Sequence, residues 1–188
     1  YIAWDFVELP SQIMEHWVTE PELLEIYARH YETGEPIPAA LVEKLDKSKY
    51  FNQGFINTEL LAASLLDIAY YTQEAPAVVD VQSFEKEYLD RIGLIPEIVS
   101  RYRSTYFLHI IDGYDSGYYS YTWAAVLDND AFEAFREKGV FDRATAESFR
   151  RNILEKDGTM DAMQMYVNFR GREPQIEPLL KNRGLISQ

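Results

Sequence analysis

Cysteine is absent from all 188 residues, so the chain can form no disulfide, no thiolate metal site and no cysteine nucleophile. Any metal would have to be held by carboxylates or by the three histidines. Long apolar runs are also missing, since the longest ones, such as residues 60–63, fall far short of the roughly 20 residues that a membrane-spanning helix needs. We therefore expect no membrane segment, and a sequence without cysteine suits the cytoplasm.

Positive charge is scarce as well. The formal net charge is -13, from 31 acidic and 18 basic residues. Phosphate backbones and anionic lipid surfaces would on average be repelled, which argues against a nucleic-acid or membrane partner. An acidic balance also serves solubility, so it indicates no particular substrate.

The strict alternation of half-buried strands is nearly absent, and apolar residues recur mostly at helical spacing. We therefore expect a mainly α, multi-helical fold in a single domain over residues 1–188. At most a short strand is expected near residues 106–111, where aromatic and β-branched side chains gather.

Capping residues and glycines predict where the helices begin and end. Caps are expected at Thr19, Asn57, Asp142 and Thr159. The stripe formed by Leu61, Leu65 and Ile68 has i, i+4, i+7 spacing and is predicted to face the core. A long helix is expected over residues 115–138, bent near residues 128–130.

The first candidate site lies in residues 6–17. Glu8 and Glu15 are seven residues apart and so share nearly the same helical face, close to apolar side chains. A carboxylate pair on a partly apolar face can serve metal or acid/base chemistry. Far more often, one such carboxylate is solvated and the other is salt-bridged, so spacing alone leaves both interpretations open.

The second candidate site is rich in tyrosine. Tyr114, Tyr118 and Tyr121 have i, i+4, i+7 spacing, so in a helix their phenols would share one stripe over about 10 Å, with His109 just before it. A neutral phenol donates one hydrogen bond, which a developing oxyanion needs. The alternative is an aromatic core stripe with its hydroxyls at the surface. Periodicity alone favours that alternative, and two neighbouring glycines favour the site.

Three separated segments carry a resemblance to a known family. Residues 5–12 (DFVELPSQ), residues 109–121 (HIIDGYDSGYYSY) and residues 169–174 (FRGREP) with Gly184 and Leu185 are similar to the thimet oligopeptidase and peptidyl-dipeptidase family of zinc metallopeptidases. Residues 52–63 and 102–107 also resemble that family. The resemblance therefore covers essentially the whole chain and agrees with a helical fold.

The resemblance implies a peptidase of short peptides whose zinc is held by two histidines of an H-E-x-x-H motif and by a downstream glutamate. Glu8 matches that glutamate. The histidine pair and its glutamate base do not occur in these 188 residues. We expect a missing N-terminal part of the same polypeptide to carry them, and we expect the isolated chain neither to bind zinc by itself nor to be active.

The tyrosine-rich segment matches the side of the cleft that binds substrate in that family. By resemblance, His109 and Tyr121 donate to the oxyanion and the bound peptide, as does Tyr114 from a glycine-rich loop, and Tyr118 contacts the substrate backbone. Family members often carry two or three glycines before the tyrosine that matches Tyr114, whereas Asp112 and Gly113 stand here.

The remaining residues of interest receive simpler interpretations. Glu15 matches an acidic position of the family and is assigned to orient a metal-binding histidine. His16 and His30 are predicted to be surface or capping residues.

Two other functional classes stay open at this point. The chain could be a helical module that binds peptides in a tyrosine-rich groove without cleaving them. It could also be a purely structural acidic domain, which would require the tyrosine stripe to be fully buried. Within the peptidase interpretation, the sequence does not separate a dipeptidyl carboxypeptidase from an endo-acting oligopeptidase.

Overall fold

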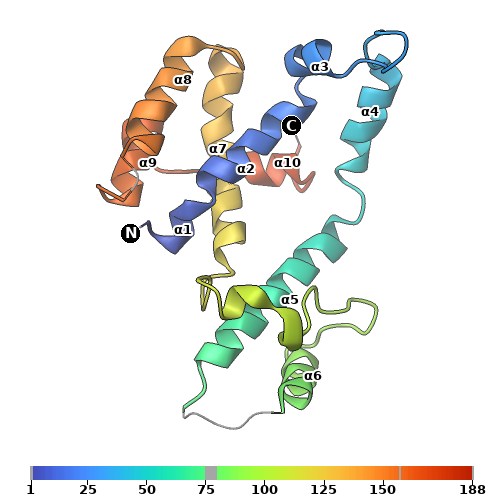
Figure 1. Cartoon of the computed structure of the whole chain (residues 1–188), viewed down its shortest axis with the longest axis vertical. Coiled ribbons are helices and arrows are strands. Elements are labelled where there is room, and N and C mark those ends of the chain that lie inside the picture. The colour runs from blue at the N-terminus through green and yellow to red at the C-terminus, as the bar shows by residue number, and fades with distance from the viewer. Residues whose placement is uncertain (1, 75–79, 157, 188) are drawn as a thin grey trace. The chain divides into compact units, whose positions relative to one another are not determined.

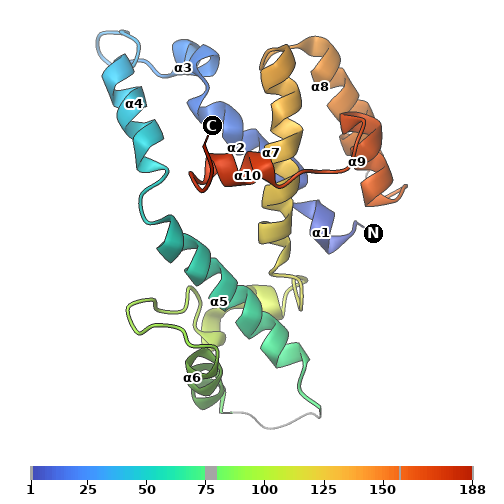
Figure 2. The same cartoon turned by 180° about the vertical axis from the view of Figure 1, so that it is seen from behind.

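The computed structural model describes residues 2–74, 80–156 and 158–187, and these are predominantly helical (Figures 1 and 2). Within those ranges no strand forms, and one isolated antiparallel bridge joins Arg29 and Pro36. The chain divides into two compact units, unit 1 with residues 1–51 and 123–188, and unit 2 with residues 52–122. The expected mainly α fold is confirmed. The expected single domain stays a prediction, and each unit is described by itself.

Unit 1 contains most of the helices. In chain order they are α1 (Trp4–Val7), α2 (Leu9–Glu15), the 3-10 helix η1 (His16–Thr19), α3 (Pro21–Tyr27), α4 (Ala39–Ser48), α7 (Ser120–Lys138, from Trp123 on), α8 (Arg143–Phe149), the π-helical η4 (Arg150–Leu154), α9 (Ala162–Arg170) and α10 (Glu177–Asn182). Helix α9 lies beside η4, which continues α8 (Figures 1 and 2).

The core of unit 1 is aromatic and joins helices that are far apart in the sequence. Helix α2 contributes Leu9 and Ile13, which are four residues apart and therefore share one face. Pro10 is tolerated in the first turn of α2, where the backbone N–H has no intrahelical partner. The other buried members are Phe6, Leu127, Ala131, Phe132, Phe135, Val140, Phe149, Ile153, Met165 and Tyr166.

Unit 2 contains α5 (Gln53–Tyr71), α6 (Val81–Arg91) and two 3-10 turns, η2 (Ser104–Tyr106) and η3 (Leu108–Ile110). No strand forms near residues 106–111, where at most a short one was expected, because most of this run belongs to the two 3-10 turns. Phe107 lies between them, is 2% exposed, and accepts a hydrogen bond from the Ile110 amide at 3.2 Å. A six-residue apolar run does not by itself distinguish a strand from a buried turn.

Two predictions about α5 are wrong. The helix begins at Gln53 rather than after Asn57, whose amide lies inside the helix and donates to the Gln53 carbonyl at 2.6 Å. Leu61 and Leu65 are 47% and 43% exposed instead of facing the core. The buried face carries smaller side chains together with one leucine, namely Ala62, Ala63, Leu66 and Ala69. Because both faces of α5 are apolar, periodicity could not choose between them.

The start of α7 also differs from the prediction. It begins at Ser120 rather than near residue 115, and it runs through residues 128–130 as one uninterrupted helix. The polar residues expected to bend it, Asp128, Asn129 and Asp130, are all buried. Buried polar side chains require partners, and each of the three has hydrogen bonds within unit 1.

Capping was predicted correctly at one of three helix starts in unit 1. Asp142 caps α8 by accepting from the backbone amide three residues on, at 2.7 Å. The caps predicted at Thr19 and Thr159 are wrong, because Glu20 and Asp161 occupy the N-cap positions of α3 and α9.

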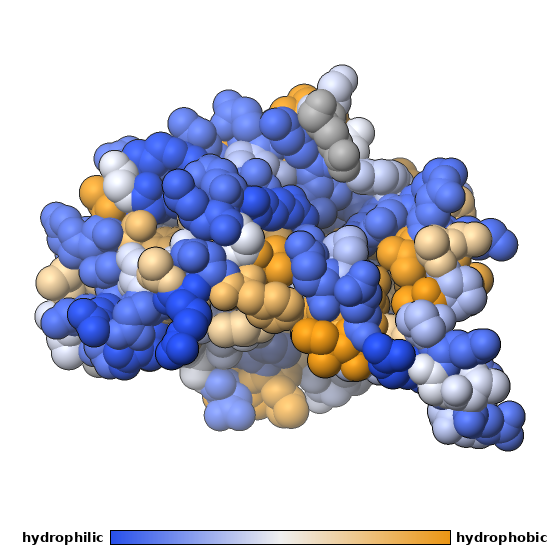
Figure 3. Space-filling view, turned by 90° about the horizontal axis from the view of Figure 1, so that it is seen from above, coloured by the Kyte–Doolittle hydropathy of each residue, from blue (hydrophilic) through white to orange (hydrophobic). Residues whose placement is uncertain are grey.

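The face seen in Figure 3 is mostly hydrophilic, with separate hydrophobic patches. None of the helices in the described ranges combines the length and the apolarity that crossing a bilayer requires.

Candidate functional site

Glu8 lies at the junction between α1 and α2, where it is the C-cap of one helix and the N-cap of the next. Its neighbours Phe6 and Leu9 are 4% and 0% exposed and anchor the junction in the core, while Glu8 itself is half-buried. The Ser11 hydroxyl donates to Glu8 Oε2 at 2.6 Å, a short hydrogen bond of the kind that a charged acceptor forms. The carboxylate is therefore held in place on a packed segment.

A carboxylate oxygen is a suitable zinc ligand, but a catalytic zinc has three protein ligands. Among the residues that the structure describes, no group of three His, Asp or Glu side chains could hold a metal ion. Glu15 is the last residue of α2 and is exposed. No metal site is complete within the described residues, and the roles of Glu8 and Glu15 both stay predictions.

His16 is not the surface residue that the sequence predicted. Its Nε2 lies 2.7 Å from Asp128 Oδ1, and the two side chains are 12% and 4% exposed. Its ring stacks on Phe132 at 4.8 Å, and Gln12 donates to the other Asp128 oxygen at 2.9 Å. Burial raises the pKa of Asp128, and its contacts with His16 oppose that shift. The pair fastens α2, the helix that follows Glu8, to α7.

His30 agrees with its prediction. It is exposed beyond the end of α3, and its Nδ1 accepts from the backbone amides of Glu32 and Thr33, both at 3.3 Å. It therefore closes a turn and has no place in the candidate site.

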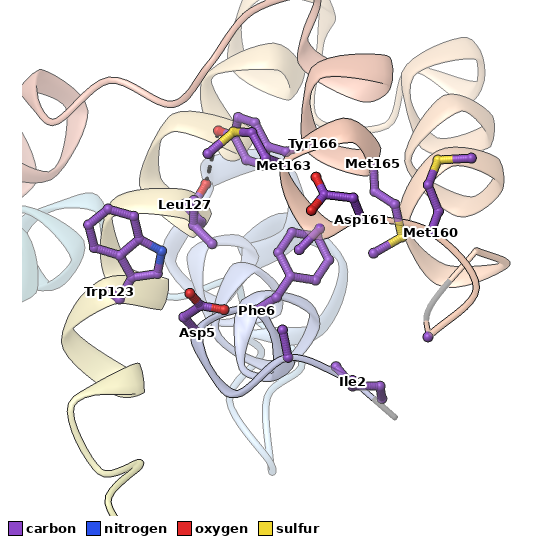
Figure 4. Close-up of a pocket in the computed structure, with 13 residues that line it drawn as sticks. Ile2, Asp5, Phe6, Trp123, Leu127, Met160, Asp161, Met163, Met165 and Tyr166 are labelled. Atoms are coloured by element: carbon purple, nitrogen blue, oxygen red, sulfur yellow. Dashed lines mark hydrogen bonds between the residues drawn. The ribbon is translucent and has the colours of Figure 1, made fainter.

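A pocket of about 410 Å³ lies beside the Glu8 segment in unit 1 (Figure 4). Its walls come from α1, α7 and α9 and include Asp5, Phe6, Trp123, Leu127 and Met163. Methionine and aromatic side chains make an adaptable apolar lining. No sequence pattern predicted this pocket, because its walls lie far apart along the chain.

The tyrosine-rich segment forms a compact aromatic cluster in unit 2. The ring of His109 lies 5.6 Å from that of Tyr114, 5.0 Å from Tyr118 and 6.0 Å from Tyr121. The rings of Tyr114 and Tyr121 stack at 5.6 Å. The structure therefore brings the four predicted residues together, but not as a helical stripe, because Tyr114 and Tyr118 precede α7 in a series of turns.

Asp67 on α5 holds these turns in place, and sequence reasoning missed it. Its carboxylate is fully buried and accepts from the backbone amides of Ser116 and Tyr118, both at 3.0 Å. Ser116 has a φ of 58°, which is uncommon for a residue with a side chain. Burial raises the pKa of Asp67, and the two amides oppose the shift. The sequence signal for a role of Asp67 was that it is a single acidic residue within the apolar run 65–69.

The cluster contains an unsatisfied polar atom. His109 Nδ1 is buried and has no hydrogen-bond partner within the described part of the chain. An unpaired buried polar atom costs about 1 to 3 kcal/mol, so a ligand that pairs with it would gain binding energy. Beside it, burial raises the pKa of Tyr118 to about 12, which keeps the phenol protonated at neutral pH.

The C-terminal FRGREP segment anchors the chain to α7 in unit 1. Arg172 binds both oxygens of the fully buried Asp130 carboxylate, at 2.6 and 3.0 Å. The Tyr166 hydroxyl donates to Asp130 at 2.6 Å, and Arg170 Nε donates to its backbone carbonyl at 3.0 Å. Gly171 has a φ of 79°, a conformation that favours glycine and lets the chain turn between the two arginines. This segment has a structural role.

The sequence profile of peptidase family M3 matches residues 1–185. The chain is 44% identical over 184 residues to the dipeptidyl carboxypeptidase of Salmonella typhimurium, which covers 96% of this chain. It is 38% identical over 188 residues to the oligopeptidase A of the same organism, covering 98% of this chain. The saccharolysin of Saccharomyces cerevisiae is 31% identical over 188 residues, again covering 98%. These alignments span only 26% to 27% of the length of the three relatives.

Proposed function

Because this chain belongs to peptidase family M3, we propose that it is one part of a zinc metallopeptidase that hydrolyses short peptides. The observation that carries the proposal is the cluster in which tyrosine rings surround His109, whose buried Nδ1 has no hydrogen-bond partner in the described residues. Relatives named as a dipeptidyl carboxypeptidase and an oligopeptidase support the reaction class. The proposed location is the cytoplasm.

Unit 1 supplies one zinc ligand, Glu8, in this proposal. Its carboxylate is positioned by Ser11 and by the packed helix that follows. A zinc ion, when bound, polarises the scissile carbonyl and lowers the pKa of its bound water toward 7. The histidine pair and the base belong to a preceding part of the same polypeptide, and the isolated chain is expected to be inactive.

Unit 2 supplies the groups that hold the reacting peptide. His109, Tyr114 and Tyr121 donate hydrogen bonds to the oxygen that gains charge, while Tyr118 contacts the peptide backbone. Donors that are already in position stabilise that oxyanion strongly because little reorganisation is needed during the reaction. The fixed turns of this unit support these roles. The role of Tyr118 rests on the resemblance alone, because its side chain is 2% exposed.

Turnover of a short peptide by the intact parent enzyme tests the proposal. Tyr121→Phe is expected to lower kcat about a hundredfold or more, because one oxyanion donor is lost. Tyr119→Phe removes the hydroxyl of a 43% exposed neighbour and should leave kcat unchanged. Wild-type turnover by the Tyr121→Phe enzyme would remove Tyr121 from the mechanism.

A second candidate function is peptide binding without cleavage. It is favoured by the lack of a three-ligand metal group among the described residues. The coding sequence upstream of Tyr1 distinguishes the two functions. An H-E-x-x-H motif in the same reading frame supports the peptidase, whereas a start codon at or just before Tyr1 supports the binding module.

A further inference from the structure

Helix α5 holds one loop of unit 2, formed by residues 110–118, at both of its ends. At the first end, the Tyr71 hydroxyl donates a hydrogen bond to the Ile110 carbonyl. At the other end, the Asp67 carboxylate accepts from two backbone amides of the loop, both at 3.0 Å. Asp67 and Tyr71 are four residues apart and therefore lie on nearly the same face of α5. The 110–118 loop is thus fixed at two points to one helix.

The 110–118 loop carries or adjoins two of the groups proposed to bind the oxyanion. His109 directly precedes Ile110, and its carbonyl accepts from the Tyr114 amide at 3.2 Å. Tyr114 lies in the middle of the loop, and its own carbonyl accepts from the Gly117 amide at 2.8 Å. A shift at either end of the loop therefore moves the backbone that carries His109 and Tyr114.

Two unfavourable features accompany the contact between Asp67 and the loop. Asp67 is fully buried, and burying a carboxylate is costly unless it is hydrogen-bonded. Ser116, one of the two residues that donate to it, has a φ of 58°. Such backbone conformations persist only where the surrounding contacts impose them, and they are common at functional sites. An apolar residue at position 67 would avoid both features, so the contact itself needs an explanation.

We propose that Asp67 and Tyr71 are positioning residues of the peptidase reaction, which hold His109 and Tyr114 where both can donate to the oxyanion. This inference rests on the proposed function and deepens it, since it adds two residues that act through the 110–118 loop without contacting the peptide. Donors stabilise an oxyanion best when they are already directed at it before the reaction. A displacement of about 1 Å can lower a rate about a hundredfold.

The test measures kcat and KM of the intact parent enzyme on one short peptide. Asp67→Asn replaces one of two acceptor oxygens by an NH₂ group, which cannot accept from a backbone amide. We expect kcat to fall about 10- to 100-fold while KM changes by no more than about twofold. Tyr71→Phe removes one hydrogen bond and should lower kcat about 3- to 10-fold, again with little change in KM.

The matched control is Glu85→Gln. Glu85 is also a buried carboxylate of unit 2, and it accepts from the Ser104 amide at 2.9 Å. It therefore resembles Asp67 in chemistry and burial but holds η2 instead of the 110–118 loop. This variant should lose stability and keep the wild-type kcat.

Different outcomes overturn different claims. A wild-type parent that does not cleave the peptide contradicts the proposed function itself. Wild-type kcat in Asp67→Asn or in Tyr71→Phe overturns the role of that residue and leaves the peptidase proposal standing. An equal fall of kcat in Glu85→Gln, or a change confined to KM, also overturns the positioning role. If Asp67→Asn does not fold, Tyr71→Phe decides, because it removes a single hydroxyl from a side chain that is 46% exposed.

Discussion

At the scale of single residues, Tyr118 shows how burial sets the chemistry of the aromatic cluster. Its side chain is 2% exposed, and burial raises the pKa of its phenol to about 12 from an ordinary value of about 10. Because the pKa in the folded state is the higher one, this group stabilises the fold fully below about pH 10. That contribution is lost as the pH rises through about 12. At neutral pH the phenol remains a hydrogen-bond donor.

An alkaline titration of tyrosinate absorbance tests this shift. The difference between the chain and its Tyr118→Phe variant should appear only near pH 12 or on unfolding. A midpoint near pH 10 for Tyr118 would mean that its hydroxyl is solvated, contrary to the structure.

Asp67 gives a second prediction, about the turns that carry Tyr114 and Tyr118. Asp67→Ala removes the acceptor of two backbone amides, and hydrogen bonds to a charged group contribute about 1.5 to 3 kcal/mol each. Because the substitution also removes the cost of burying the carboxylate, the free energy of unfolding should fall by a smaller total of about 2 to 4 kcal/mol, measured by urea denaturation. Asp112→Ala, at an exposed aspartate of the same turns, should change it by no more than about 0.5 kcal/mol. Equal effects would exclude Asp67 as the anchor.

At the scale of elements, buried ion pairs fasten the ends of the chain to α7. Asp130→Ala leaves Arg172 without its carboxylate and the Tyr166 hydroxyl with only its longer hydrogen bond, to the Leu127 carbonyl at 3.3 Å. Breaking a buried pair typically costs about 3 to 5 kcal/mol, and thermal or urea unfolding should show a loss of that size.

The control for Asp130 is Glu137→Gln. Glu137 pairs with Arg170 at 2.9 Å but is 55% exposed, so its loss should cost at most about 1 kcal/mol. A small effect of Asp130→Ala, similar to that of Glu137→Gln, would contradict the anchoring role of the FRGREP segment.

The elements also show what the sequence could predict. Asp142 was found as a cap because its partner is only three residues away. The buried face of α5 was predicted wrongly because both faces of the helix are apolar. Leu61 and Leu65 lie on the exposed face, and alanines lie on the buried one. The pairing of His16 with Asp128 spans 112 residues, and no local pattern encodes such a contact.

Only part of the candidate site could be predicted, again because some of its contacts join residues that are far apart in the sequence. Glu8 and the residues around His109 were found by resemblance, and the clustering of the four rings agrees with their expected shared location. Their expected helical stripe did not form, since the turns are held by Asp67 from another helix. Asp67 and Tyr71 could not be placed at the cluster before the fold was known.

At the scale of the whole molecule, the proposed peptidase function requires more residues than this chain contains. The alignments cover about 27% of the length of the bacterial relatives, and the described residues bring together no three metal ligands. Each unit contributes a different part of the proposed chemistry, Glu8 from one and the cluster around His109 from the other. The central claim is that Glu8 is a zinc ligand of the parent enzyme.

Zinc content tests that claim most directly, measured by elemental analysis of the purified parent enzyme together with peptide hydrolysis. Glu8→Gln should retain well below one zinc per polypeptide and lose nearly all activity, because a neutral amide is a weaker zinc ligand than a carboxylate. Glu22→Gln, at an exposed glutamate of α3, should keep one zinc and wild-type activity. One zinc and full turnover in the Glu8→Gln enzyme would contradict the account.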